Sequence, residues 1–186
     1  MDLKSEFTRI AMENIHRNGL TDLMTWLEGT DFYTAPASTK YHGAYEMGLL
    51  QHSLNVYVQL KQLCAWYNRS DISPESIAIV ALFHDFCKIG MYKPELRWRK
   101  DDNNQWEQYA TWKHDEDFAY GGHGSKSVYL VQNFMKLSPD EASAINCHMG
   151  AWDRSDYSNP SEVYNRNALA WLLHVADEAA TYMMEN

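Results

Sequence analysis

Apolar side chains recur every three or four residues over much of the chain, which is the spacing of an amphipathic helix. The pattern predicts a first helix over residues 3–17 and a second over 20–27, which Gly29 ends. A longer helix is predicted from residue 44 to about 68. On the inward face of this third helix, His52 takes a place where the pattern favours a leucine.

The most continuously apolar stretch, residues 77–83, ends on the adjacent pair His84 and Asp85. A Ser-Pro-Glu start signal at 73–75 predicts a helix from there to about Lys88. Burying an imidazole beside a carboxylate at the end of such a helix is unfavourable unless a cation compensates. A divalent metal ion is the simplest partner, since it binds a neutral histidine nitrogen and a carboxylate oxygen together.

Residues 95–112 lose the helical period, and their alternating aromatic and polar side chains around a turn-rich Asp-Asp-Asn-Asn predict a β-hairpin. This hairpin suits either a cover flap or an aromatic wall for a base, and its tryptophans suit a dimer face as well. Further helices are predicted over 125–136, 139–148 and 160–184. We therefore expect an all-α helical bundle with one small β-hairpin, forming a single domain over residues 1–186.

Composition narrows the class of protein. The chain has 186 residues, 45% of them hydrophobic, which is a globular composition. We find no signal-peptide pattern and no apolar run of about 18 residues, so a cytoplasmic location is the expectation. Three cysteines without CxxC spacing predict reduced thiols. A net charge of −9 argues against tracking a long phosphate backbone but permits small anionic substrates beside a metal.

Six potential metal ligands lie at helix ends or on otherwise apolar helical faces, and they come from five different helices or their margins. Such a set is what a one- or two-metal site in a helical bundle requires. Two lysines accompany the set: Lys88 lies one turn after the histidine of the His-Asp pair, and Lys126 lies near the start of another helix. The six candidates are His52, His84, Asp85, His123, His148 and Asp177. Candidates for orienting these ligands or the substrate are Glu46, Asp153, Arg154 and His174.

The order of these residues, together with the segments around them, resembles the HD-domain superfamily of metal-dependent phosphohydrolases. The resemblance covers about residues 36–180, and the segment PASTKYHGAYEMGLLQHS is similar to small phage- and prophage-type members and to the HD module of 3′–5′ exoribonucleases. The most specific blocks are GLLQHSLNVY, ALFHDFCKIG, GGHGSKSVY, INCHMGAWD and LLHVADEAATY.

The resemblance implies roles for the candidates. Four of them would bind a first metal ion: His52, His84, Asp85 and Asp177. His123 and His148 match the additional histidines of two-metal members, in which the aspartate of the pair bridges the ions, whereas in one-metal members these positions contact substrate phosphate. The predicted catalytic residues are Asp85, Lys88 and Lys126. Either one or two divalent ions would be bound, and the sequence does not distinguish Mn, Co, Zn, Fe, Ni and Mg.

Three functions fit these features. The first is hydrolysis of a phosphoester or phosphoanhydride bond in a small-molecule nucleotide, (d)NMP or (d)NTP, by a metal-activated water. The second is 3′–5′ exonuclease activity on short oligonucleotides, which the acidic charge and the absence of a basic stripe disfavour. The third is a non-catalytic, metal-containing nucleotide-binding module. No membrane partner is expected, and assembly into a homo-oligomer is left open.

Overall fold

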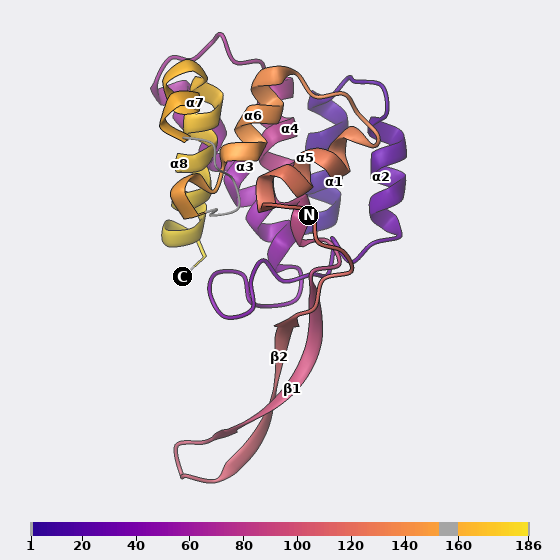
Figure 1. Ribbon diagram of the computed structural model, residues 1–186, viewed down its shortest axis with the longest axis vertical. Coiled ribbons are helices and arrows are strands. Elements are labelled where there is room, and N and C mark those ends of the chain that lie inside the picture. The colour runs from indigo at the N-terminus through magenta and orange to yellow at the C-terminus, as the bar shows by residue number, and fades with distance from the viewer. Residues whose placement is uncertain (1, 153–159, 186) are drawn as a thin grey trace.

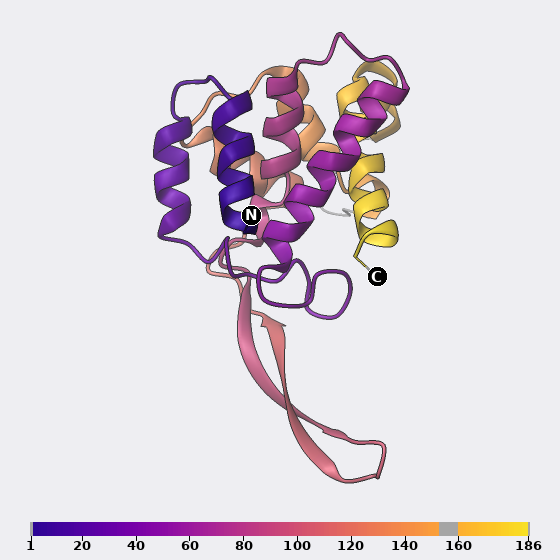
Figure 2. The same cartoon turned by 180° about the vertical axis from the view of Figure 1, so that it is seen from behind.

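A computed structural model describes residues 2–152 and 160–185 of the chain, which form eight α-helices and one antiparallel hairpin (Figures 1 and 2). This confirms the fold class expected from the sequence. The helices are α1 (Leu3–Asn14), α2 (Leu20–Glu28), α3 (Gly48–Trp66), α4 (Pro74–Phe83), α5 (His123–Gln132), α6 (Pro139–Cys147), α7 (Pro160–Arg166) and α8 (Ala168–Met183). Two short 3-10 turns, η1 (Phe86–Lys88) and η2 (Gly150–Trp152), follow α4 and α6.

Helix α4 is the centre of the bundle. Every residue from Ile77 to Phe83 is buried, as expected for a helix that is apolar all round. The helices α1, α3, α6 and α8 all contact it. Whatever lies at the carboxyl end of α4 is therefore held inside the bundle, surrounded by the other helices.

Helix α4 ends earlier than the sequence predicts, and the difference matters for the site. The predicted end was about Lys88, but regular helix stops at Phe83, and the backbone of Asp85 leaves helical geometry at φ −102° and ψ 20°. Neighbouring residues in a continuous helix point about 100° apart. Because the helix ends at the His-Asp pair, both side chains can face the same point.

The predicted helix over 160–184 is divided into α7 and α8 at Asn167. Its backbone is extended, with φ −129° and ψ 98°, and its side chain accepts hydrogen bonds from the backbone amides of Leu169 and Ala170. Asparagine is among the residues that favour this capping position, so it starts a new helix. Helix α3 likewise begins at Gly48 rather than at residue 44, because Met47 adopts a left-handed backbone with φ 66°.

The hairpin pairs β1 (Tyr92–Lys100) with β2 (Trp106–His114) and is slightly longer than predicted. Figures 1 and 2 show that it extends away from one end of the bundle. Leu96, Trp98 and Trp106 are 62%, 62% and 65% exposed. Within the part of the chain that the structure describes, no helix has both the length and the apolar character needed to cross a membrane.

Candidate metal centre

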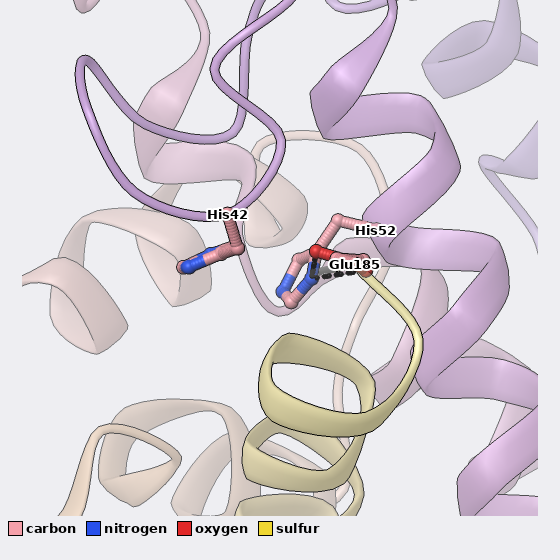
Figure 3. Close-up of side chains that lie close together, drawn as sticks. All are labelled: His42, His52 and Glu185. Atoms are coloured by element: carbon pink, nitrogen blue, oxygen red, sulfur yellow. Dashed lines mark hydrogen bonds and ion pairs between the residues drawn. The ribbon is translucent and has the colours of Figure 1, made fainter.

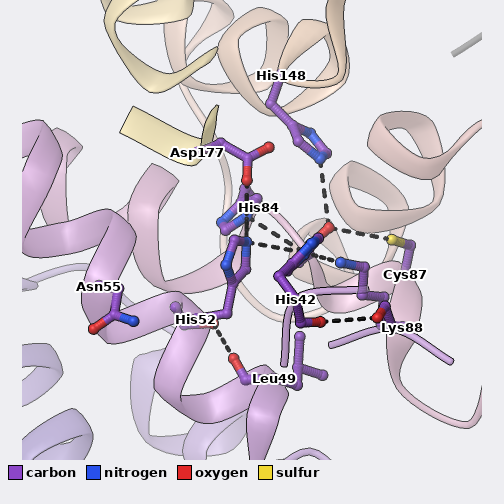
Figure 4. Close-up of polar contacts among 12 residues, drawn as sticks. His42, Leu49, His52, Asn55, His84, Cys87, Lys88, His148 and Asp177 are labelled. Atoms are coloured by element: carbon purple, nitrogen blue, oxygen red, sulfur yellow. Dashed lines mark hydrogen bonds and ion pairs between the residues drawn. The ribbon is translucent and has the colours of Figure 1, made fainter. Parts of the chain in front are cut away.

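Residues far apart in the sequence meet at the carboxyl end of α4. His52 comes from α3, His84 from the end of α4, His148 from the end of α6, and Asp177 from α8 (Figure 4). Asp85 directly follows His84. Four of the five are at most 2% exposed, and Asp177 is 8% exposed. A buried cluster of imidazoles and carboxylates requires compensating charge, so its geometry is the test of whether a cation fits.

Four separations between potential ligand atoms are close to those found around a tetrahedral ion. The Nε2 atom of His52 lies 3.1 Å from Oδ1 of Asp177 and 3.3 Å from Nε2 of His84. Both of these imidazole nitrogens lie 3.5 Å from Oδ2 of Asp85. Ligand atoms at 2.0–2.1 Å from a tetrahedral zinc-type ion would lie about 3.3 Å from one another. The donor types and their separations therefore fit a divalent cation.

The histidine rings are held so that Nε2 faces the centre. Nδ1 of His84 donates to the carbonyl oxygen of Ala81 at 2.9 Å, and Nδ1 of His148 donates to that of Ile145 at 2.7 Å. A hydrogen bond at one ring nitrogen fixes the tautomer and leaves the lone pair of the other nitrogen for a metal. The early end of each helix thus supplies both the position of the ring and the carbonyl that orients it.

Asp85 has one carboxylate oxygen on each side of the centre. Oδ2 faces His52 and His84, while Oδ1 lies 3.4 Å from Nε2 of His148 and 3.8 Å from Sγ of Cys87. Ligand atoms of Asp85, Cys87 and His123 also lie within 4.8 Å of one another. His123 is the first residue of α5. Asp85 therefore directs one carboxylate oxygen toward each of two groups of potential ligands.

The two central imidazoles, His84 and His52, differ in pKa. Burial lowers the pKa of His84 to about 4, so this ring is neutral. Burial on its own would also lower the pKa of His52, but hydrogen bonds to Asp177 and Glu185 raise it to about 9. In the chain without a metal ion, a proton on His52 therefore compensates the neighbouring carboxylates. Burial would raise the pKa of Asp85, yet the ammonium of Lys88, 2.5 Å from Oδ2, holds it well below its ordinary value.

The two predicted catalytic lysines have different partners. Lys88 is buried against Asp85, whereas the buried Lys126 donates to Oε2 of Glu116 at 3.2 Å and to the carbonyl of Phe118 at 3.1 Å. The catalytic role predicted for Lys126 stays a prediction.

Among the candidates for orienting roles, Nδ1 of His174 donates to the carbonyl of His148 at 2.6 Å, and Glu46 is exposed. Asp153 and Arg154 lie outside the described residues.

Sequence reasoning missed two neighbours of His52. Oε1 of Glu185 lies 3.0 Å from Nδ1 of His52, and the ring centroid of His42 lies 5.0 Å from that of His52 (Figure 3). Ligand atoms of the three residues lie within 4.8 Å of one another. Glu185 lies two residues after the end of α8, and His42 lies in the loop before α3, so neither stands on an apolar face where a polar residue would be conspicuous.

Comparison with known protein families gives one assignment. The family model described as HD domain matches residues 49–182, more than two thirds of the chain. The matched segment contains all six predicted ligands, whereas His42 and Glu185 lie outside it. No curated protein and no solved structure matches the chain.

Proposed function

The chain belongs to the HD-domain family, whose members are generally metal-dependent phosphohydrolases, and we propose that it hydrolyses a phosphoester or phosphoanhydride bond of a nucleotide, either a (d)NMP or a (d)NTP. The observation that carries this proposal is that potential ligand atoms of His52, His84, Asp85 and Asp177 lie 3.1–3.5 Å apart in the four pairs described above. A divalent ion bound there would lower the pKa of a water and polarise the phosphoryl oxygen under attack.

The side chains around this point have distinct roles in the proposal. His84, neutral at physiological pH, offers its Nε2 lone pair without first losing a proton. Asp85 presents one oxygen to each side of the centre. Lys88 stabilises that carboxylate and places a positive charge where a substrate phosphate would approach. His148 and His123 would hold either a second ion or a phosphate oxygen.

The hairpin favours a second candidate function, 3′–5′ cleavage of short oligonucleotides. Nζ of Lys100 lies 5.7 Å from the ring centroid of Trp106, and both are exposed. An exposed aromatic ring beside a cation is a suitable surface for stacking a base. The net charge of −9 opposes the approach of a long strand, so the mononucleotide remains the primary proposal.

A substrate panel tests these proposals. The purified chain is incubated with mononucleotides, nucleoside triphosphates and a labelled oligonucleotide in the presence of Mn²⁺, Co²⁺ or Zn²⁺. Replacing Asp85→Asn should reduce hydrolysis by at least about 100-fold, because it removes an anionic ligand shared by both sides of the centre. Asp22→Asn, an equivalent exchange at an exposed position on α2, is the control and should retain activity.

The outcomes separate the three functions. Release of phosphate, pyrophosphate or triphosphate from a nucleotide supports the primary proposal, and shortening of the oligonucleotide supports the second. If every substrate stays intact under all metals, or if Asp85→Asn is as active as the wild type, catalysis at this centre is refuted. Binding of nucleotides without turnover would instead indicate a non-catalytic module.

A further inference from the structure

The orienting contact of His52 differs from those of His84 and His148. The Nδ1 atoms of the latter two donate to backbone carbonyl oxygens, which are neutral acceptors. Nδ1 of His52 instead faces the carboxylate of Glu185, at 3.0 Å from Oε1 and 3.2 Å from Oε2. A hydrogen bond to a carboxylate is stronger than one to a neutral oxygen and makes the opposite ring nitrogen more basic.

The position of Glu185 is well determined by its neighbours. Its side chain is only 1% exposed, and Nδ2 of Asn55, one turn after His52 on α3, donates to Oε1 at 2.9 Å. A carboxylate buried to this extent is unfavourable unless it has partners that favour its charge. The contacts with His52 and Asn55 supply such partners, and they hold the carboxylate of Glu185 beside Nδ1 of His52.

The summed charge of the buried side chains around His52 supports a role for Glu185 in the metal centre. Asp85, Asp177 and Glu185 contribute three negative charges, and the buried ammonium of Lys88 contributes one positive charge. The two negative charges that remain match a single divalent cation. Buried charges are tolerated when they are balanced, so Glu185 belongs to the group of charges that an ion at this site would neutralise.

We propose that Glu185 is a positioning residue of the metal centre: it fixes His52 in the tautomer with a proton on Nδ1 and strengthens Nε2 as a metal ligand. The inference rests on the proposed function only in placing an ion at Nε2 of His52. It predicts that Glu185 controls how tightly the ion is held while making no contact with the substrate.

The affinity of the metal-free protein for Co²⁺ tests this proposal. Binding is measured at several pH values between about 6.5 and 9 by competition with a chromophoric chelator, which separates the affinity of the deprotonated site from competition with a proton on His52. The visible spectrum of bound Co²⁺ reports the ligand geometry. Glu185→Gln preserves the size of the side chain and an acceptor oxygen but removes the charge. It should weaken binding by about 10- to 100-fold, as is typical for an orienting partner of a ligating histidine. At saturating Co²⁺ the spectrum should match the wild type, because the ligands themselves are unchanged.

A control variant separates this role from a general effect of charge. Glu178→Gln removes the same charge from the residue directly after Asp177 on α8. Glu178 belongs to none of the potential metal-ligand groups among the described residues, so the Co²⁺ affinity of this variant should equal that of the wild type. Asn55→Ala removes the donor to Glu185 and should weaken binding less than Glu185→Gln does. A Co²⁺ affinity of Glu185→Gln within twofold of the wild type, or a loss equal to that in Glu178→Gln, would overturn the proposal. An altered spectrum at saturation would also overturn it, since the ligand set itself would then depend on Glu185.

The same measurements distinguish this proposal from the proposed function. If the wild type binds Co²⁺ but hydrolyses no nucleotide, and Glu185→Gln still weakens binding, the positioning role stands and the proposed function fails. If nucleotides are hydrolysed and Glu185→Gln binds Co²⁺ as tightly as the wild type, only the positioning role fails. A wild-type chain that binds no divalent ion would overturn both.

Discussion

Metal binding should release one proton from His52, and this makes the affinity depend on pH in a calculable way. The metal-free imidazole has a pKa of about 9, because Asp177 and Glu185 outweigh the effect of burial, which lowers it. A metal ligand must be deprotonated, so the ion has to displace this proton. Near pH 7 the proton weakens binding by about 100-fold, or about 3 kcal/mol, relative to the deprotonated site. Between about pH 6.5 and 8.5 the affinity should rise about tenfold per pH unit.

Calorimetry provides the assay. Titrating the ion into the metal-free protein in two buffers of different ionisation enthalpy gives the number of protons released, which should be close to one for the first ion. His84 contributes none, since burial lowers its pKa to about 4. Burial would lower the pKa of His148 too, but its contact with Asp85 raises it. His114→Gln, at an exposed position on β2, should leave the number unchanged.

The same proton affects the stability of the metal-free fold, with a sign that can be worked out. A folded-state pKa raised from 6.5 to about 9 stabilises the fold fully below about pH 6.5, and this stabilisation is lost as the pH rises through about 9. The lowered pKa values of Asp177 and Glu185 act only at acidic pH and add no slope in this range. The melting temperature of the metal-free chain should therefore fall between about pH 7 and 9.5. A pH-independent affinity with no proton release would refute a protonated His52.

Two substitutions test other parts of the structure. Lys88→Met leaves the buried carboxylate of Asp85 without its cation and should destabilise the metal-free fold by about 3–5 kcal/mol, measured by urea unfolding. The loss should be smaller when the ion is bound, and an equal loss in both forms would contradict this. Gly90→Ala should lower the free energy of unfolding by about 1–2 kcal/mol, because Gly90 has a left-handed backbone with φ +66°, which a residue with a Cβ adopts only with strain. Gly29→Ala, where a Cβ meets its nearest atom at 3.5 Å and no left-handed backbone is involved, should change stability little, and equal effects of the two glycine exchanges would argue against strain.

Local signals explain why much of the fold is readable from the sequence. The helix starts at Ser73 and Ser138 depend on residues within one turn, and both serines cap as expected, with the second forming a reciprocal pair with Glu141. The apolar stretch of α4 needs no partner to be recognised as buried. In contrast, Asn167 is compatible with two local structures, because an asparagine can either continue a helix or cap the start of a new one with its side chain.

The convergence of the site depends on where helices end, which periodicity does not reveal. The pattern extends α4 past the His-Asp pair, and in such a helix His84 and Asp85 would point in different directions. The structure ends the helix at Phe83, and both side chains reach the same centre. The polar residues were conspicuous in the sequence because they interrupt apolar faces, so their identity was predictable while their geometry was not.

The charge of the centre shows what a motif alone omits. The acidic residues recognisable from the sequence, Asp85 and Asp177, together with Lys88 leave one net negative charge, which a divalent ion would overcompensate. Glu185 supplies the missing charge through a contact that spans 133 positions in the chain and lies beyond the segment matched by the family model. No local pattern encodes such a contact, because it depends on how α3 and α8 pack against each other. The candidate ligands of this centre are thus recognisable in the sequence, whereas its charge balance, and with it the expected competition between a proton and a metal ion at His52, is a property of the folded chain.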